Sequence, residues 1–148
     1  MSLISTLNSP LKGIVPPMVT PLNADGSLDI ASVNKLIEHL ISGGVHGIFI
    51  LGTTGEFSGL SYKTRRNLIT QTCNQAEGRV PILVGITDVS IEESIALAEF
   101  SAEAGAFAVV VAPPFYNNID QKELTQYYLQ LADAISIPMF LYNMPSHT

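Results

Sequence analysis

Short runs of apolar residues recur along this chain about every 30 residues, and longer amphipathic stretches separate them. The runs are unbroken stretches rich in Ile, Val, Leu and Phe, a pattern typical of strands buried on both faces of a parallel sheet. We expect strands at residues 13–19, 47–51, 81–85, 108–111 and 138–142. Corresponding positions are separated by 34, 34, 27 and 31 residues, at Ile14, Ile48, Ile82, Val109 and Phe140. Each repeat therefore has the length of one βα unit.

The stretches between these strands carry helix signals. Each begins after an Asp or Ser, residues that favour the N-cap position. The expected helices are residues 30–42, 62 to about 76, 91 to about 104 and 121 to about 135, after the caps Asp29, Ser61, Ser90 and Asp120. Glu93 and Glu123 follow their caps at the spacing of a capping box.

Two architectures use alternating strands and helices. A doubly wound sheet normally has a glycine-rich phosphate turn after its first strand, but here that strand runs into Pro16 and Pro17. A (βα)8 TIM barrel needs eight units in typically about 250 residues. We therefore predict an α/β fold in which residues 1–148 form the N-terminal half of a single TIM-barrel domain, with four βα units and strand five.

Composition excludes several classes of protein. With 47% hydrophobic and 14% charged residues the chain is too apolar to be disordered, and it has no apolar run of membrane-spanning length. A net charge of −6 argues against nucleic-acid binding. We interpret the one basic cluster, Lys63, Arg65 and Arg66, as a solvated helix face. The single cysteine, Cys73, excludes an internal disulfide, and we expect a cytoplasmic protein without membrane or nucleic-acid partners.

In a barrel, the active site lies on the loops that follow the strands. The most informative of these is Gly52-Thr53-Thr54-Gly55-Glu56. Its glycines allow a tight turn, and exposed N–H groups with two hydroxyls suit a small carboxylate. The alternatives are an ordinary turn in which the Thr side chains bond their own backbone, and a phosphate site, although no lysine follows as in a P-loop.

Two tyrosines lie on the same expected rim. Tyr142 ends the fifth strand and Tyr116 lies in a proline-rich loop. Each alone fits a structural aromatic residue, but together with a threonine their hydroxyls could relay protons.

The histidines and carboxylates add little chemistry. We expect His39 and His46 to be structural, whereas His147 lies past strand five on the active-site rim and could contact substrate. Glu56 is expected to brace its loop, and Cys73 to pack as a small apolar group. No spacing of His, Cys, Asp or Glu indicates a metal site.

Three motifs together resemble one enzyme family. Gly-Thr-Thr-Gly-Glu at 52–56, Pro-Phe-Tyr-Asn at 114–117 and Tyr-Asn-Met-Pro at 142–145 are similar, in order and spacing, to the dihydrodipicolinate synthase and N-acetylneuraminate lyase family. The resemblance covers residues 13–148. It implies a (βα)8 barrel and class I aldolase chemistry, in which a lysine on strand six forms a Schiff base with pyruvate or a related 2-oxo acid. No cofactor is implied.

The resemblance also implies residue roles. Thr54, with backbone N–H groups of the turn that includes Gly52 and Gly55, would hold the substrate carboxylate. Thr53 would link two tyrosine hydroxyls, and Tyr142 would shuttle protons. Tyr116 would reach into the site of a neighbouring subunit, which implies a homo-oligomer, a dimer or tetramer.

Two departures from the family pattern matter. The lysines, Lys12, Lys35, Lys63 and Lys122, lie before the first strand or on helical segments, so none can be the Schiff-base lysine. We therefore expect the 148-residue chain alone to be inactive. His147 also stands where the synthases carry an arginine, whose fork binds carboxylates in a way His cannot.

The second substrate therefore stays open. Within the family, a sugar-acid aldolase, an N-acetylneuraminate-type lyase or a 2-oxo-3-deoxy-acid dehydratase is an alternative to a synthase. A hypothesis from another class is a catalytically inactive half-barrel fragment.

Overall fold

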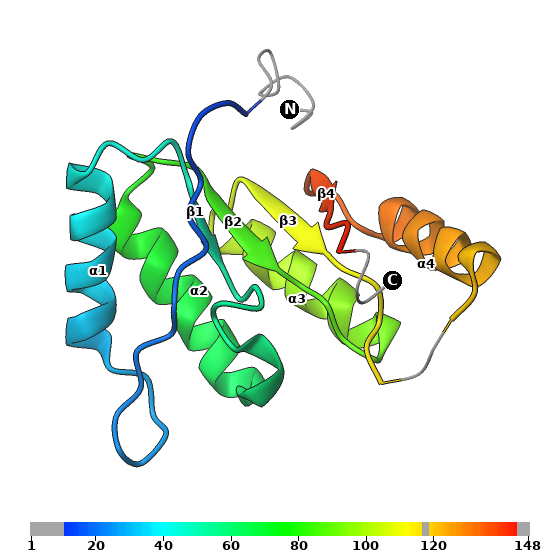
Figure 1. The fold of residues 1–148 in the computed structure, drawn as a ribbon, viewed down its shortest axis with the longest axis horizontal. Coiled ribbons are helices and arrows are strands. Elements are labelled where there is room, and N and C mark those ends of the chain that lie inside the picture. The colour runs from blue at the N-terminus through cyan, green and yellow to red at the C-terminus, as the bar shows by residue number, and fades with distance from the viewer. Residues whose placement is uncertain (1–10, 117–118, 145–148) are drawn as a thin grey trace.

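Four parallel strands form one sheet in chain order (Figure 1). The computed structural model describes residues 11–116 and 119–144. The strands are β1 (Ile48–Ile50), β2 (Ile82–Gly85), β3 (Ala108–Val111) and β4 (Met139–Leu141). All neighbouring pairs are parallel, so the carboxyl ends of the strands lie at one edge of the sheet. The expected α/β class is confirmed, and the sheet fits part of a barrel.

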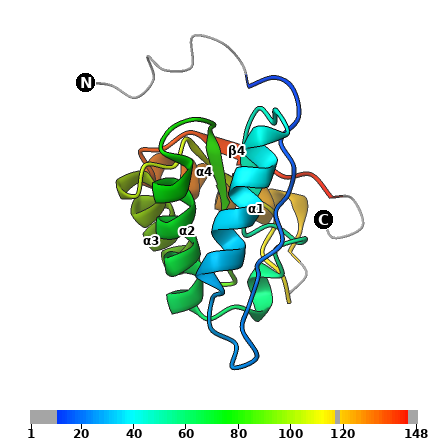
Figure 2. The same cartoon turned by 90° about the vertical axis from the view of Figure 1, so that its left-hand side faces the viewer.

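The helices follow the strands as expected from the sequence. They are α1 (Ile30–Ser42), α2 (Tyr62–Ala76), α3 (Ile91–Glu103) and α4 (Gln121–Ala134), and a short 3₁₀ helix, η2 (Phe57–Gly59), precedes α2. Figure 2 shows α1, α2 and α3 side by side. Among the described residues, no helix is long and apolar enough to cross a membrane.

The two capping boxes behave differently. Asp120 and Glu123 form the complete box, with each side chain accepting from the other residue's N–H. Ser90 Oγ accepts from the N–H of Glu93 at 3.3 Å, but it donates its own proton to Glu92 Oε2 at 2.8 Å. The expected second box is therefore only half formed, because the Ser90 N–H, which Glu93 would have to accept from, donates instead to Asp88 Oδ1 at 3.2 Å.

The expected first strand, residues 13–19, is an extended segment beside β1 with only an isolated bridge, Pro17 to Phe49. Phe49 N–H donates to the Pro16 carbonyl at 3.0 Å, and Met18 N–H donates to the Phe49 carbonyl at 2.8 Å. The segment thus pairs in parallel with β1, as expected. Pro16 and Pro17 have no N–H to donate, so a regular ladder cannot continue through them.

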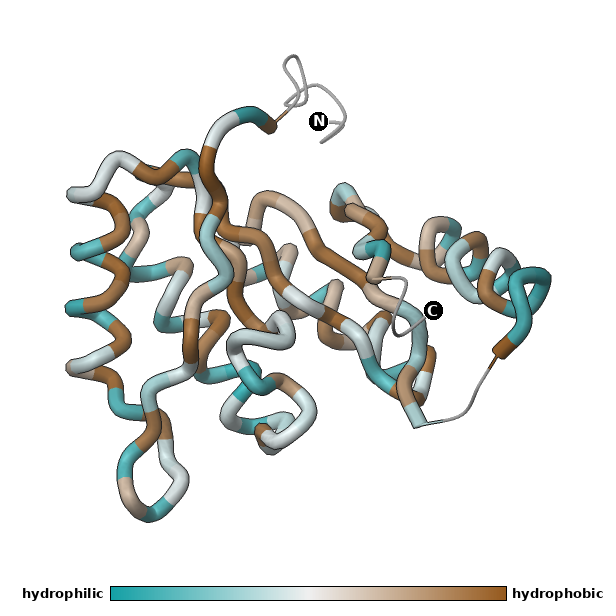
Figure 3. Tube along the Cα trace, viewed as in Figure 1, coloured by the Kyte–Doolittle hydropathy of each residue, from teal (hydrophilic) through white to brown (hydrophobic). Residues whose placement is uncertain are grey.

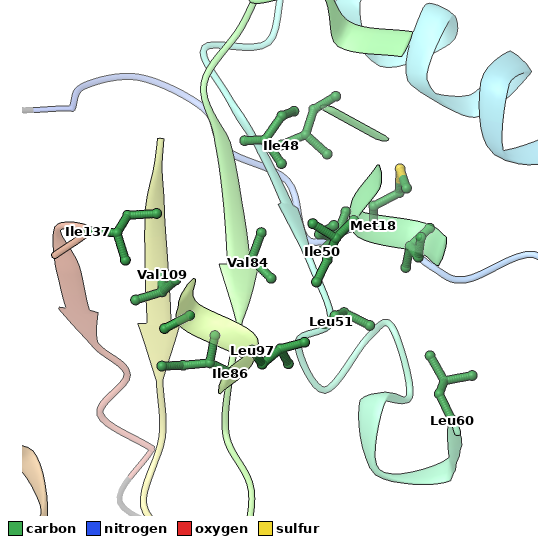
Figure 4. Packing of buried hydrophobic residues seen from close by; sticks show 14 of the residues in the cluster. Met18, Ile48, Ile50, Leu51, Leu60, Val84, Ile86, Leu97, Val109 and Ile137 are labelled. Carbon is green, nitrogen blue, oxygen red and sulfur yellow. The ribbon is translucent and has the colours of Figure 1, made fainter. Parts of the chain in front are cut away.

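Alternate residues of the strands pack on opposite faces of the sheet. One set packs against the helices in the main core, which Figure 4 shows in part. This set is Ile48, Ile50, Ile82, Val84, Val109 and Val111. Leu83, Ala108 and Val110 form a second cluster on the other face, with Phe49 and Tyr142 against it. Both faces are therefore apolar, which explains why the strands are unbroken hydrophobic runs in Figure 3.

The backbones of β1 and β2 approach closely where the strands end. A Cβ added at Gly85 would lie 2.1 Å from the Leu51 carbonyl oxygen and 2.7 Å from its carbonyl carbon. Leu51 itself has a φ of 58°, in the left-handed region, and is buried. The absence of a side chain at position 85 therefore leaves room for the Leu51 carbonyl where the chain turns out of β1.

Gly85→Ala should lower the free energy of unfolding by about 1–3 kcal/mol, the usual cost of overpacking, because backbone atoms would have to move. Denaturant unfolding followed by circular dichroism measures the change. Gly59→Ala is the control, since a Cβ there meets nothing within 4 Å. Equal stability of the two variants would contradict the close approach of Leu51.

Polar side chains join α1 to the end of α2. Arg79 Nη1 donates to Glu38 Oε2 at 2.9 Å, and Gln75 Nε2 donates to Glu38 Oε1 at 2.6 Å. The hydrogen bond from Arg79, followed by that from Gln75, lowers the pKa of Glu38 to about 2. Because the folded-state pKa lies below the unfolded one, the contribution to stability is present above about pH 4.5 and is lost as the pH falls toward 2.

Glu38→Gln should therefore be less stable than the wild type at neutral pH, and the gap should close in acid. Urea unfolding at pH 7 and at pH 3 measures both differences. Glu99→Gln is the control, because Glu99 is an exposed helical carboxylate without a hydrogen bond to the described residues. A gap that stays constant between the two pH values would contradict the ion-pair explanation.

Candidate active site

The turn at residues 52–56 follows β1 directly. The N–H of Gly55 donates to the Gly52 carbonyl, and the N–H of Glu56 donates to the Thr53 carbonyl, both at 3.0 Å. Among the described residues, the N–H groups of Thr53 and Thr54 have no backbone acceptor. The turn therefore uses two of its amides internally and leaves the two threonine amides available for a ligand.

Neighbouring residues fix this turn from several sides. A Cβ at Gly52 would lie 2.7 Å from the Phe49 ring, and one at Gly55 would lie 3.1 Å from the Met18 carbonyl. Thr20 Oγ1 donates to the Gly55 carbonyl at 2.8 Å. Glycine is thus required by close packing at both positions, and Thr20, which sequence reasoning did not single out, fastens the turn to the segment before α1.

The threonines open onto a cavity on the sheet face that faces away from the helices. The cavity has a volume of about 340 Å³. It is lined by Leu11, Val15, Pro17, Phe49, Thr53, Thr54, Leu83, Val110, Phe140, Leu141 and Tyr142. Its lining is mostly apolar, and Thr53, Thr54 and Tyr142 are the lining residues that carry hydroxyls.

Three of the residues selected from the sequence therefore meet at one cavity. Tyr142 is half-buried, and its ring packs edge-on against Phe49 with 6.4 Å between centroids. This contact packs Tyr142 against β1, the strand that leads into the turn. Among the described residues, the Thr53 hydroxyl makes no hydrogen bond to Tyr142 or Tyr116.

Tyr116 is placed differently. It is 94% exposed, does not line the cavity, and has a φ of 87°. Such a conformation costs a non-glycine residue about 1–3 kcal/mol and is concentrated at functional sites. The preceding Phe115 packs edge-on against Phe57, with centroids 5.5 Å apart. Asn117 and His147 lie outside the described residues.

The remaining titratable candidates lie outside the cavity lining. His46 Nδ1 accepts from the N–H of Ile14 at 3.0 Å, which joins the loop after α1 to the N-terminal segment. His39 lies in the last turn of α1. Burial raises the pKa of the Cys73 thiol to about 11, so it remains protonated and packs beside the core. Glu56 is exposed and adopts a φ of 54°, so its part in the turn is made by its backbone.

No group of three His, Cys, Asp or Glu side chains in the described part of the chain could hold a metal ion. The lysines on helices are Lys35 in α1, Lys63 in α2 and Lys122 in α4. Lys12 lies in the segment that precedes β1.

The interpretation of the basic cluster is wrong for one of its members. Lys63 and Arg66 are exposed, but Arg65 is 5% exposed and pairs with Asp88, with 2.9 Å between Nη1 and Oδ2. Residues 62–66 form the first turns of α2, so one position in the run must face inward. The signal available in the sequence was helical spacing. Arg65 lies three residues before the apolar Leu68 and so on the same side of the helix, and Leu68 is buried.

Comparison with known proteins agrees with this geometry. The sequence model of the Dihydrodipicolinate synthetase family matches residues 10–148. The solved dihydrodipicolinate synthase of Bacteroides thetaiotaomicron is 55% identical, with a TM-score of 0.89, over 95% of this chain and 47% of its own. YagE of Escherichia coli K12, solved in complex with pyruvate, is 37% identical with a TM-score of 0.90, over 95% and 47%.

The N-acetylneuraminate lyase of Mycoplasma synoviae is 34% identical with a TM-score of 0.86, over 93% of this chain and 48% of its own. The chain spans about half the length of the curated relatives it matches. The resemblance drawn from the three motifs is thereby confirmed. The turn, the cavity and the match over residues 10–148 lead to one conclusion: the chain belongs to the dihydrodipicolinate synthase family.

Proposed function

We propose that the protein carrying these residues is a lyase or synthase that makes or breaks a C–C bond of pyruvate or a related 2-oxo acid. The observation that carries this proposal is the convergence of Thr53, Thr54 and Tyr142 on one cavity at the carboxyl ends of parallel strands. The relative YagE, solved with pyruvate, supports the substrate class. An apolar cavity with a few polar groups at one end is suited to a small acid.

Thr54 would hold the substrate carboxylate. Its hydroxyl borders the cavity, and its N–H and that of Thr53 have no backbone acceptor among the described residues. Two amides and a hydroxyl donated to one carboxylate are charge-assisted hydrogen bonds, which are stronger than neutral ones.

Tyr142 would move protons at the 2-oxo carbon, with Thr53 linking its hydroxyl to that of Tyr116 from a neighbouring subunit. In class I aldolase chemistry a lysine amine attacks the oxo group, water leaves, and the resulting iminium accepts electrons as the adjacent C–H or C–C bond breaks. Each step needs a group that gives and takes a proton, and a tyrosine on the cavity wall fits this task.

The lysine itself would come from outside these 148 residues. The described lysines lie on helices or in the segment before β1, and none of them lines the cavity. We infer that the chain is the N-terminal half of one (βα)8 domain, whose later strands would cover the face that carries Leu83 and Val110. The named relatives do not favour a non-catalytic half-barrel module.

Tyr116 supports a homo-oligomer, a dimer or tetramer, in which its side chain reaches a neighbouring subunit. Its side chain is 94% exposed and so accessible to another subunit, and its left-handed backbone is a form of strain that is concentrated at functional sites.

The second substrate has two candidate classes. The synthase of Bacteroides thetaiotaomicron, at 55% identity, favours a synthase. His147, in place of the arginine of the synthases, favours an aldolase, lyase or dehydratase of sugar-derived acids, and the N-acetylneuraminate lyase among the similar structures is one such enzyme. Turnover by the complete protein with aspartate semialdehyde, compared with sugar-derived 2-oxo acids, distinguishes the two classes.

Borohydride reduction in the presence of pyruvate tests the proposed chemistry. The complete protein should gain a covalent adduct on one lysine, detected by mass spectrometry, whereas the 148-residue chain alone should gain none. Reduction without pyruvate is the control. No adduct on the complete protein would refute the Schiff-base proposal, and an adduct on the isolated chain would refute the inferred location of the lysine.

Removal of two hydroxyls should separate binding from proton transfer. Thr54→Val should raise KM for the 2-oxo acid about tenfold or more, the effect of one lost hydrogen bond to a charged group. Tyr142→Phe should lower kcat by about 10²–10⁴-fold, the usual contribution of a general acid or base. Steady-state kinetics measures both effects.

Thr70→Val, at an exposed position of α2, and Tyr128→Phe, at a partly buried position of α4, are the matched controls. If they change KM and kcat as much as the cavity variants do, the assigned roles are wrong.

A further inference from the structure

A buried ion pair lies behind the candidate site and joins the loops that form it. Arg65 projects from the first turns of α2, and Asp88 lies in the loop after β2. Their side chains are only 7% and 5% exposed, and neither lines the cavity. Buried pairs are rarely gained for stability, because desolvation offsets most of the attraction.

Arg65 also holds the chain that leaves the Thr53–Thr54 turn. Its Nε donates to the Leu60 carbonyl at 3.2 Å, just after η2. Its guanidinium carbon lies 5.7 Å from the centre of the Phe57 ring and 4.9 Å from that of Tyr62. One planar cation therefore binds a carboxylate, a carbonyl and two aromatic faces, a set of contacts that the fork of arginine allows and lysine does not.

Asp88 completes the link to the loop after β2. Its Oδ1 accepts from Tyr62 Oη at 3.3 Å and from the Ser90 N–H at 3.2 Å. The carboxylate thus fixes the cap of α3 to the start of α2. Next to it, Thr87 Oγ1 accepts from the N–H of Ala112 at 2.9 Å, which ties the same loop to the residue that follows β3.

The Phe57 ring links Arg65 to the segment that contains Tyr116. It contacts Arg65 and also packs edge-on against Phe115, the residue before Tyr116. The ion pair therefore joins the loops after β1 and β2 directly and reaches the loop after β3 through Phe57 and Thr87, and the loops after β1 and β3 carry proposed site residues.

We propose that Arg65 is a positioning residue, which acts with Asp88 to hold the Thr53–Thr54 turn and the Phe115–Tyr116 segment in the geometry that substrate binding needs. This inference rests on the proposed function. A displacement of about 1 Å in a positioned group can reduce a reaction rate about 100-fold, so loss of the pair should affect kinetics beyond its effect on folding.

The test uses the complete protein. The quantities measured are the rate of borohydride-trapped adduct formation with pyruvate, the KM for pyruvate in that reaction, and the thermal unfolding temperature. Arg65→Lys keeps the charge beside Asp88 but loses the contact to Leu60 or to the rings. It should raise KM about tenfold while the protein remains folded. Arg66→Lys is the matched control, because the neighbouring Arg66 is exposed and contacts Phe100 instead; KM should not change.

The double variant Arg65→Met, Asp88→Leu separates positioning from stability. Replacing a buried pair by apolar residues leaves no unpaired charge and is often neutral for stability. We expect an unfolding temperature near that of the wild type together with a KM at least about tenfold higher. If KM returns to the wild-type value once stability is restored, or if Arg65→Lys matches Arg66→Lys, the pair is only structural and the inference is overturned.

Failure of the inference is distinct from failure of the proposed function. If the wild-type protein traps no pyruvate, the Schiff-base function is wrong. If the wild type traps pyruvate and all Arg65 variants trap it with the same KM, only the positioning role is wrong.

Discussion

Parallel pairing of neighbouring strands is the constraint on which the rest of this structure depends. Because β1, β2, β3 and β4 all run in one direction, every strand ends at the same edge of the sheet, and every following loop must turn there. Segments far apart in the sequence, such as Phe57 and Phe115, thereby come into contact. The candidate site is a consequence of strand direction more than of any single residue.

The same strands supply both the scaffold and the site. Residues of one parity, such as Ile48 and Val84, pack under the helices and fix the sheet. Residues of the other parity, such as Phe49 and Leu83, form the apolar wall of the cavity. The wall therefore stays rigid because its neighbours in the chain are locked in the main core, which is the kind of support that a precise binding geometry requires.

The polar groups of the candidate site lie at the edge of this apolar wall. The Thr53–Thr54 turn begins just after Leu51, which takes up a left-handed conformation, and Gly85 leaves room for the Leu51 carbonyl. Behind the turn, a buried arginine and aspartate join the surrounding loops. The backbone strain and the buried charges both lie within or directly behind the candidate site. Selection for stability alone would disfavour both features.

The sequence by itself determined the element order, the α/β class, the family and the turn at residues 52–56, because periodicity, caps and short motifs are local signals. The predictions from the sequence were wrong about the exposure of Arg65, the completeness of the Ser90 capping box and the regularity of the first strand. Only the tertiary structure decided those features, and the placement of Tyr116 outside the cavity that Tyr142 and the threonines line. They depend on which groups come together from distant parts of the chain, and the physical reason is that burial and competing hydrogen-bond partners are properties of the packed molecule.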